Sequence, residues 1–259
     1  MKIEILYPEI CNLYGDLANI RYLKECLPQA EIIETPLQSR PAFADAPVDL
    51  VYMGTTTENG QILALEQLRL IRESIFERIR EGGNFLITGN AMELFGASIE
   101  EDGEEVARGL GVFPGIARRS SINRFNSLFL GTFDTAEEEP IRIVGYKSQF
   151  GHTFGPEKEG EGTLESMALF SALRGPGMNR YAKGEGIRIN NFLATYVIGP
   201  LLILNPPFTK WYIRNQLGVP IEELAYEKAA MDSYQCRVEE YSDPNTGLYY
   251  WGGTTERWT

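Results

Sequence analysis

The chain has 259 residues, with 24 Lys and Arg against 36 Asp and Glu, which gives a formal net charge of −12. Its length suits one large α/β domain or two small ones, and a composition of 43% hydrophobic and 23% charged residues excludes disordered and fibrous chains. The acidic charge disfavours nucleic acid and anionic membranes as partners. No apolar stretch reaches the length of a membrane span or a signal-peptide core, so we expect a cytoplasmic protein.

Two residue types that often carry chemistry are scarce. The only histidine is His152, and the three cysteines are Cys11, Cys26 and Cys236. A single histidine excludes chemistry that needs a histidine pair, and His-rich metal sites with it. Unevenly spaced cysteines without a Cys-x-x-Cys pair fit reduced thiols. We therefore expect neither a metal nor a cofactor.

The first half of the chain alternates strand and helix signals. Short apolar runs predict strands at 3–7, 31–34, 49–54 and 84–88. A helix is expected from Asp16, as its N-cap, to about residue 27, where Pro28 ends it. A longer helix is expected over 61–80, because its apolar residues recur every three or four positions. After Gly89 a shorter helical stretch is expected over 91–95.

This alternation predicts a parallel sheet covered by helices, because parallel strands need crossover connections. Ligands of such sheets bind beyond the carboxyl ends of the strands. The loops at 8–15, 54–60 and 89–91 each follow a predicted strand. We therefore expect these loops to converge on one site.

The second half of the chain is richer in strand signals. Strands are expected at 127–133, 141–146 and 187–197, the last interrupted at Asn190-Asn191. The segment 151–186 holds eight glycines and predicts long loops. Helices are expected over 206–217 and from Pro220 to about residue 231, followed by a turn-rich aromatic tail. We expect one domain over 1–218 and a C-terminal helical and aromatic extension over 219–259, packed on the domain or on a partner.

The segment 83–96, GNFLITGNAMELFG, has the layout of a nucleophile elbow. An apolar strand leads through a tight turn into a helix whose amide groups can stabilise an oxyanion. The turn holds Gly89, which has no side chain that could attack a substrate. Taken by itself, the segment is read more simply as an ordinary strand-to-helix turn.

Five separated segments, in this order, resemble one protein family. They are 6–16 with Asn19, 49–51 leading into Gly54, 109–115, 143–146 with 151–153, and 195–202 with Asn205-Pro206. Together they resemble the class I glutamine amidotransferases of the cobyric acid synthase-like group, and most the glutaminase subunit of lipid II isoglutaminyl synthase. The resemblance implies a flavodoxin-like α/β fold, in which a mostly parallel sheet carries helices on both faces.

The chain departs from this family at the residues that carry its chemistry. The family elbow reads G-I-C-G-G, and its cysteine position falls on Gly89, with Asn90 at the next glycine. The histidine of the family motif Y-L-H-G falls on Ile198. Acyl transfer from an amide needs a nucleophile and a group that moves a proton. The resemblance therefore implies that glutaminase activity is lost, with degenerate nucleophile and base positions at Gly89 and Ile198.

Further departures fall on the same predicted face. The family's glycines after Gly54 are replaced by Thr55, Thr56 and Thr57, and within the motif G-[FY]-E-x-H-x-G-R-T, Gln149 replaces the histidine and His152 the arginine. The candidates for a polar pocket are Tyr14, Asp16, Asn19, Gly54, Thr55, Thr56, Asn90, Gln149 and His152. Cys11, on the loop after the first strand, is the alternative nucleophile, although a buried thiol explains it more simply. Thr88 is expected to point away from the site.

These observations favour a catalytically degenerate amidotransferase-like protein that acts as a binding or regulatory subunit. The resemblance implies a Mur ligase-like synthetase or an active amidotransferase paralogue as its partner, in cell-wall or cobalamin-type amidation. The aromatic residues Tyr249, Tyr250, Trp251 and Trp258 would contact that partner or pack on their own domain. Two alternatives remain: an active amidotransferase with relocated or partner-supplied catalytic groups, and a sensor of a small polar ligand.

Overall fold

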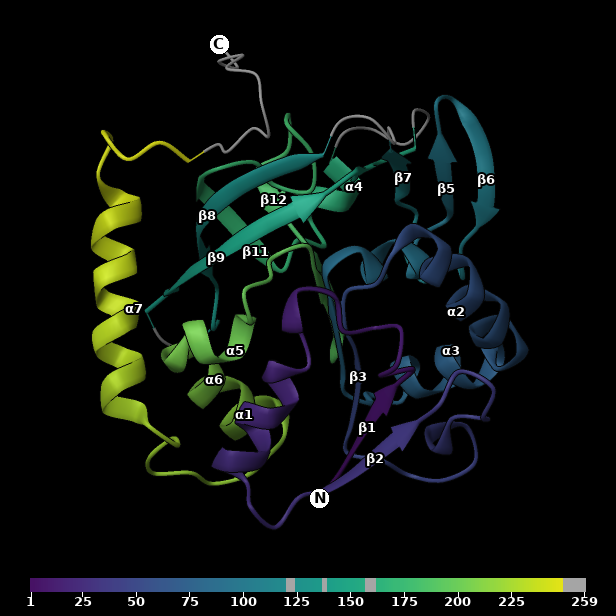
Figure 1. Cartoon of the computed structure of the whole chain (residues 1–259), viewed down its shortest axis with the longest axis horizontal. Coiled ribbons are helices and arrows are strands. Elements are labelled where there is room, and N and C mark those ends of the chain that lie inside the picture. The colour runs from purple at the N-terminus through teal and green to yellow at the C-terminus, as the bar shows by residue number, and fades with distance from the viewer. Residues whose placement is uncertain (120–123, 137–138, 157–161, 249–259) are drawn as a thin grey trace.

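A six-stranded sheet forms the centre of the molecule, a computed structural model that describes residues 1–119, 124–136, 139–156 and 162–248 (Figure 1). Its strand order is β13-β14-β4-β3-β1-β2. All neighbours pair in parallel except β13, which lies antiparallel at one edge. The prediction of a mostly parallel sheet is confirmed. The strands are β1 (Lys2–Leu6), β2 (Glu31–Thr35), β3 (Leu50–Met53), β4 (Phe85–Thr88), β13 (Ile187–Ile189) and β14 (Phe192–Thr195).

Helices cover both faces of this sheet, as predicted. Along β3, Val51 and Met53 pack in one hydrophobic cluster and Leu50 and Tyr52 in the other, because successive strand residues face opposite sides. The first cluster includes α2 (Glu58–Leu70), α3 (Arg72–Arg80) and η2 (Ala42–Ala44). The second includes α1 (Ala18–Cys26), α5 (Leu201–Leu204) and α6 (Pro206–Trp211). The hydrophobic core therefore lies on both sides of the sheet.

Two further four-stranded sheets complete the fold. One has the order β10-β7-β5-β6 and the other β12-β11-β8-β9. The first sheet was not predicted from the sequence. The strands are β5 (Ser98–Glu101), β6 (Glu104–Arg108), β7 (Ile116–Arg119), β8 (Phe125–Phe133), β9 (Ile141–Gln149), β10 (Gly151–Phe154), β11 (Phe170–Arg174) and β12 (Gly184–Glu185).

The prediction of long loops over 151–186 is wrong in part, since within the described residues only 175–183 is a long connection without helix or strand. The segment 151–186 contributes β10, β11 and β12, together with the short α4 (Gly162–Glu165). Its glycines permit close packing: a Cβ on Gly184 would lie 2.7 Å from the Cβ of Ala168, and a Cβ on Gly177 would lie 2.3 Å from the carbonyl oxygen of Gly184. Glycines in this segment therefore permit close packing of the connecting residues against β12.

Three helix predictions need correction. The helix expected over 61–80 is divided at Ile71, whose φ of −120° and ψ of 20° end α2 and precede α3. The stretch after β4 is a 3-10 helix, η3 (Gly89–Phe95). Asp16 does not cap α1, which follows Leu17 without a side-chain cap, because the Asp16 carboxylate accepts hydrogen bonds from the Thr55 loop instead.

The C-terminal part also differs in its boundaries. The helix expected over 206–217 consists of α6 and a π-helical turn, η4 (Tyr212–Gln216). The helix expected over 220–231 begins later and runs longer, as α7 (Glu227–Ser242). Tyr234 and Tyr241 of α7 pack with Leu130 and Val144, so this helix lies against the β8–β9 sheet (Figure 1). The aromatic tail predicted beyond Leu248 lies outside the described residues.

Among the described residues, no helix combines the length and apolar character that crossing a membrane requires.

Candidate functional site

Three loops meet beyond the carboxyl ends of β1, β3 and β4. The backbone N–H of Leu13, in η1 (Leu13–Gly15), donates to the Thr55 carbonyl at 2.9 Å. The Asn90 side chain exchanges two hydrogen bonds with the backbone of Thr56. The predicted convergence of the loops at 8–15, 54–60 and 89–91 is therefore confirmed.

Gly89 adopts the positive φ of a sharp strand-to-helix turn, +64°. The space beside it is occupied by the Thr55 side chain. A Cβ on Gly89 would lie 2.0 Å from Thr55 Oγ1 and 2.8 Å from Thr55 Cβ. No side chain fits at position 89 unless Thr55 moves, so Thr55 fills the position that a residue projecting from this turn would take.

Asp16 fixes Thr55 in this place. Oδ2 of Asp16 accepts a hydrogen bond from the Thr55 backbone N–H at 2.8 Å and from its hydroxyl at 2.9 Å. The Thr88 hydroxyl donates to the same oxygen at 2.5 Å, so the expectation that Thr88 points away from this cluster is wrong. Burial raises the pKa of Asp16, and the hydrogen bonds from Thr88 and Thr55 oppose that rise.

Asn19 joins the same buried network. Its Nδ2 donates to Asp16 Oδ1 at 2.9 Å, and its Oδ1 accepts from the Leu202 backbone N–H at 2.9 Å. A Cβ on Gly54 would lie 2.7 Å from the carbonyl oxygen of Cys11, so glycine is required for this close approach. The structure thus brings four pocket candidates, Asp16, Asn19, Gly54 and Thr55, into one closely packed cluster.

The backbone N–H groups of the loop after β3 already have acceptors. The Thr55 N–H donates to Asp16, and the Thr56 N–H donates to Asn90 Oδ1 at 3.0 Å. The Asn90 Nδ2 returns a hydrogen bond to the Thr56 carbonyl at 2.8 Å. Thr57 caps α2, accepting from the Gly60 N–H at 3.1 Å. Stabilising an oxyanion requires N–H donors that are free for the substrate, so Thr55 and Thr56 would have to release their partners first.

The remaining pocket candidates lie apart from this cluster. Tyr14 is 46% exposed, and its hydroxyl lies 3.1 Å from the Ser148 hydroxyl on β9. Gln149 donates to the Gly151 carbonyl at 2.6 Å. His152 packs edge-on against Phe125 at a ring-centre distance of 5.4 Å. Burial lowers the pKa of His152 to about 4, with a smaller contribution from nearby cations. The imidazole is therefore neutral near pH 7.

Cys11 and Ile198 are both buried. Burial raises the pKa of the Cys11 thiol to about 12, so the thiolate needed for nucleophilic attack is scarce at neutral pH. Ile198 pairs with Tyr146 through two backbone hydrogen bonds of 2.9 and 3.0 Å. Its aliphatic side chain has no proton to transfer.

Sequence reasoning missed a buried carboxyl group directly behind the elbow. Glu93, on η3, accepts hydrogen bonds from Gln61 Nε2 at 2.9 Å and from the Tyr196 hydroxyl at 3.1 Å. Arg119 donates to Oε1 of the same Gln61 side chain at 2.9 Å. Burial raises the pKa of Glu93 to about 7. The signal in the sequence was a lone glutamate inside the apolar stretch 91–95.

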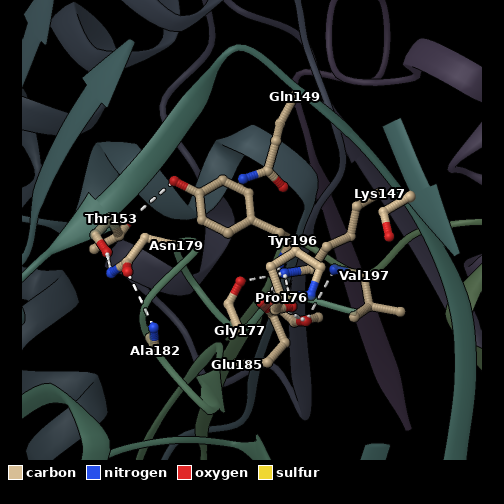
Figure 2. A network of polar contacts seen from close by, with 12 residues as sticks. Lys147, Gln149, Thr153, Pro176, Gly177, Asn179, Ala182, Glu185, Tyr196 and Val197 are labelled. Carbon is tan, nitrogen blue, oxygen red and sulfur yellow. Dashed lines mark hydrogen bonds and ion pairs between the residues drawn. The ribbon is translucent and has the colours of Figure 1, made fainter. Parts of the chain in front are cut away.

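A second missed feature is the fully buried ion pair between Lys147 and Glu185. Figure 2 shows Lys147 converging with Glu185 and the carbonyls of residues 176–177, and Lys147 donates to the Gly177 carbonyl at 2.7 Å. Glu185 also accepts from the Thr195 hydroxyl at 2.9 Å and the Tyr196 N–H at 2.8 Å. The pair therefore anchors the segment that leads to Ile198. The feature in the sequence that could have indicated this pair is Lys147, which stands at the position of the glutamate in the motif G-[FY]-E-x-H-x-G-R-T.

Two surface hollows lie away from these residues. One, of about 540 Å³, is lined by α2 and β6, and the other, of about 220 Å³, by η2 and α3 with their flanking residues. None of the nine pocket candidates lines either of them. In the described ranges, no three His, Cys, Asp or Glu side chains gather as metal ligands would.

The strand-turn-helix at Gly89 and the surrounding sheet define a class I glutamine amidotransferase fold, and residues 2–204 match the CobB/CobQ-like glutamine amidotransferase domain. The chain belongs to this family. A relative from Streptococcus pneumoniae, named lipid II isoglutaminyl synthase (glutamine-hydrolyzing) subunit GatD, is 25% identical over 250 residues, which cover 94% of this chain and 91% of the relative. The Staphylococcus aureus protein of the same name is 28% identical over 219 residues, covering 82% and 83%.

Solved structures agree on the fold. PurLQS from Thermotoga maritima superposes with a TM-score of 0.51 at 11% identity, covering 92% of this chain and 98% of that one. The glutaminase domain of Trypanosoma brucei CTPS with bound acivicin gives a TM-score of 0.50 at 10% identity, covering 88% and 97%. At these identities the likeness concerns the fold alone.

Proposed function

We propose that this chain is a CobB/CobQ-like amidotransferase domain that does not hydrolyse glutamine and serves as a binding or regulatory subunit. The observation that carries the proposal is the position of Thr55. Its Oγ1 lies 2.0 Å from the position that the Cβ of a residue at position 89 would take. Asp16 holds the Thr55 side chain there through two hydrogen bonds. A substrate carbonyl would meet a packed hydroxyl in place of an attacking group.

Glutamine hydrolysis needs a nucleophile, a group that moves a proton and free N–H donors for an oxyanion, and each of these requirements supports the proposal. Gly89 offers no nucleophile, Ile198 carries no proton, and the Thr55 and Thr56 N–H groups already have side-chain acceptors. In hydrolases that use a catalytic triad, losing one member costs roughly ten thousandfold or more in rate. A chain without nucleophile and base retains at most the contribution of binding.

The same scaffold can still serve recognition. Both curated relatives are named as subunits of lipid II isoglutaminyl synthase, so a subunit role in cell-wall amidation is the context that fits this chain. We expect it to bind a Mur ligase-like synthetase or an active amidotransferase paralogue.

The test combines an ammonia assay with a binding assay. The purified chain should release no ammonia from glutamine above the blank, alone or with the candidate synthetase, whereas an active glutaminase of the family does so at equal concentration. The synthetase should co-elute with the chain. Ammonia release that Cys11→Ala abolishes and the matched Cys236→Ala variant leaves intact would overturn the non-catalytic role. Ammonia release that appears only with the synthetase would instead support catalytic groups supplied by the partner.

A further inference from the structure

Buried hydrogen bonds connect η3, the helix after the elbow, with β10. The Tyr196 hydroxyl lies 3.1 Å from Glu93 Oε1 and 2.8 Å from Thr153 Oγ1, and Figure 2 shows it directed toward Thr153. All three residues are at most 2% exposed. In the part of the chain that the structure describes, the Thr153 hydroxyl has no hydrogen-bond partner other than Tyr196. The three side chains therefore form a short chain of hydrogen bonds that is closed to solvent and ends at Thr153.

The other carboxyl oxygen of Glu93 faces a fixed donor. Arg119 donates to Gln61 Oε1, and a guanidinium group can only donate. The Gln61 amide is therefore oriented with Nε2 toward Glu93, where it donates to Oε2 at 2.9 Å and also to the Asn90 carbonyl at 2.7 Å. A proton on Oε2 would face this donor instead of an acceptor. A proton that binds Glu93 therefore belongs on Oε1, next to Tyr196.

The Glu93 carboxyl group has no cation in direct contact among the described residues. Arg119 reaches it only through Gln61 and pairs with Glu101 of β5 at 3.1 Å. Burial raises the pKa of Glu93 to about 7; its hydrogen-bond donors and Arg119 oppose that rise, and Glu58, at the start of α2, adds to it. Both protonation states of Glu93 are therefore accessible near neutral pH.

The ionisable groups beside the chain of hydrogen bonds are accounted for. Burial raises the pKa of the Tyr196 hydroxyl well above its usual range, so this group keeps its proton. Lys147, on β9, has its Nζ 5.7 Å from the centre of the Tyr196 ring and forms the buried ion pair with Glu185. His152, on β10 beside Thr153, is neutral near pH 7. The chain of hydrogen bonds can therefore respond to Glu93 only by rotation of its hydroxyl groups.

We propose that Glu93, Tyr196 and Thr153 form a proton-controlled switch behind the elbow. When Glu93 is a carboxylate, Tyr196 donates to Glu93 and Thr153 donates to Tyr196. When a proton from water binds Oε1, the carboxyl group donates to the Tyr196 oxygen, and Tyr196 donates to Thr153. Each hydroxyl keeps its own proton and only rotates, so the net change is the uptake of one proton.

Each state of the switch carries one cost. The carboxylate state satisfies every hydrogen bond of the chain but keeps a charge in a buried site. The protonated state removes the charge but leaves the Thr153 hydroxyl proton without an acceptor. Because these costs oppose each other, a change of pH near neutrality moves the population from one state to the other. The proton state of η3 is thereby passed to β10.

Neutron crystallography of the full chain, with crystals in heavy water at pH 5 and pH 9, tests the switch directly. At pH 9 the Tyr196 deuterium should point to Glu93 Oε1. At pH 5 a deuterium should be bound to Oε1, and that of Tyr196 should point to Thr153. A deuterium on Oε2, or a Tyr196 deuterium that points to the same partner at both pH values, overturns the proposal.

Carbon-13 NMR in solution provides a second measurement. The Tyr196 Cζ signal, identified by its loss in Tyr196→Phe, should shift between pH 5 and pH 9 with a midpoint near 7. Glu93→Gln places an amide N–H where the protonated carboxyl O–H would lie, since Gln61 needs an acceptor on its own side. This variant should hold the Tyr196 signal at its low-pH position throughout. Glu66→Gln, the same change at an exposed position of α2, should leave the titration intact. A Tyr196 signal that does not shift in the wild type, or that still shifts in Glu93→Gln, overturns the proposal.

Discussion

Gly89→Ala probes the packing at the elbow directly. The new Cβ would lie 2.0 Å from Thr55 Oγ1 and 2.8 Å from Thr55 Cβ. Overpacking of this kind costs about 1–3 kcal/mol, and a residue with a Cβ at the positive φ of Gly89 costs about 1–2 kcal/mol more. We therefore expect Gly89→Ala to lower the free energy of unfolding by about 2–5 kcal/mol.

Only the overpacking part depends on Thr55, and a double-mutant cycle isolates it. Thr55→Gly removes the three atoms nearest to the new Cβ, so the two substitutions together should cost about 1–3 kcal/mol less than their sum. Thr55→Ser is the matched control. It keeps Oγ1, the atom at 2.0 Å, and should relieve little of the strain.

The assay is urea unfolding of the wild type, the single variants and the double variants, followed by circular dichroism. Equal urea dependence of the free energy across the set would show that the compared states are alike. If Gly89→Ala and Thr55→Gly add within about 0.5 kcal/mol, the Thr55 side chain does not fill the space beside Gly89. The packing argument for lost chemistry would then fail.

Three further predictions concern buried groups that titrate. The pKa of Glu93 is raised from 4.5 to about 7, so its protonated form supports folding fully below pH 4.5 and this support is lost as the pH rises through 7. The free energy of unfolding of Glu93→Gln, relative to that of the wild type, should therefore rise by up to about 3 kcal/mol between pH 5 and pH 8, as measured by unfolding at each pH. Lys147→Met should destabilise by about 3–5 kcal/mol, and Lys147→Met/Glu185→Leu by less, because the single change leaves a buried carboxylate without its cation; equal losses would contradict this reading. Iodoacetamide at pH 8 should label exposed Cys236 and spare Cys11 until the protein unfolds, as read by mass spectrometry.

Local patterns sufficed to predict the central sheet. The apolar runs that became β3 and β4 are buried on both faces, so they stand out as nearly continuous hydrophobic segments. Edge strands carry no such signal: β6 exposes four of its five residues, and its Glu and Arg residues resemble a loop. The sheet that contains β6 could therefore not be predicted from composition and periodicity.

The candidate site could likewise be predicted only in part. Topology predicted that the loops would meet, because the carboxyl ends of parallel strands share one edge. Topology could not predict that Thr55 would fill the space beside Gly89, since the two residues lie on different strand ends and their contact depends on distances of a few tenths of an ångström. The roles of Glu93 and Lys147 likewise depend on partners distant in the sequence, Tyr196 and Glu185.

Residues at which we expect the chain to depart from the family pattern fit one another at two places. Thr55 occupies the space that Gly89 leaves open, and Asn90 satisfies both backbone groups of Thr56. Glycine at position 55 beside Gly89 would leave a cavity next to Asp16, and a side chain at position 89 beside Thr55 would overlap with it. The fit is incomplete, because the buried Thr56 hydroxyl and the Gln149 side-chain carbonyl have no hydrogen-bond partner, and a buried polar group without a partner costs about 1–3 kcal/mol. The support for the proposed binding subunit therefore comes from the packing of Thr55 beside Gly89 and of Asn90 on the Thr56 backbone.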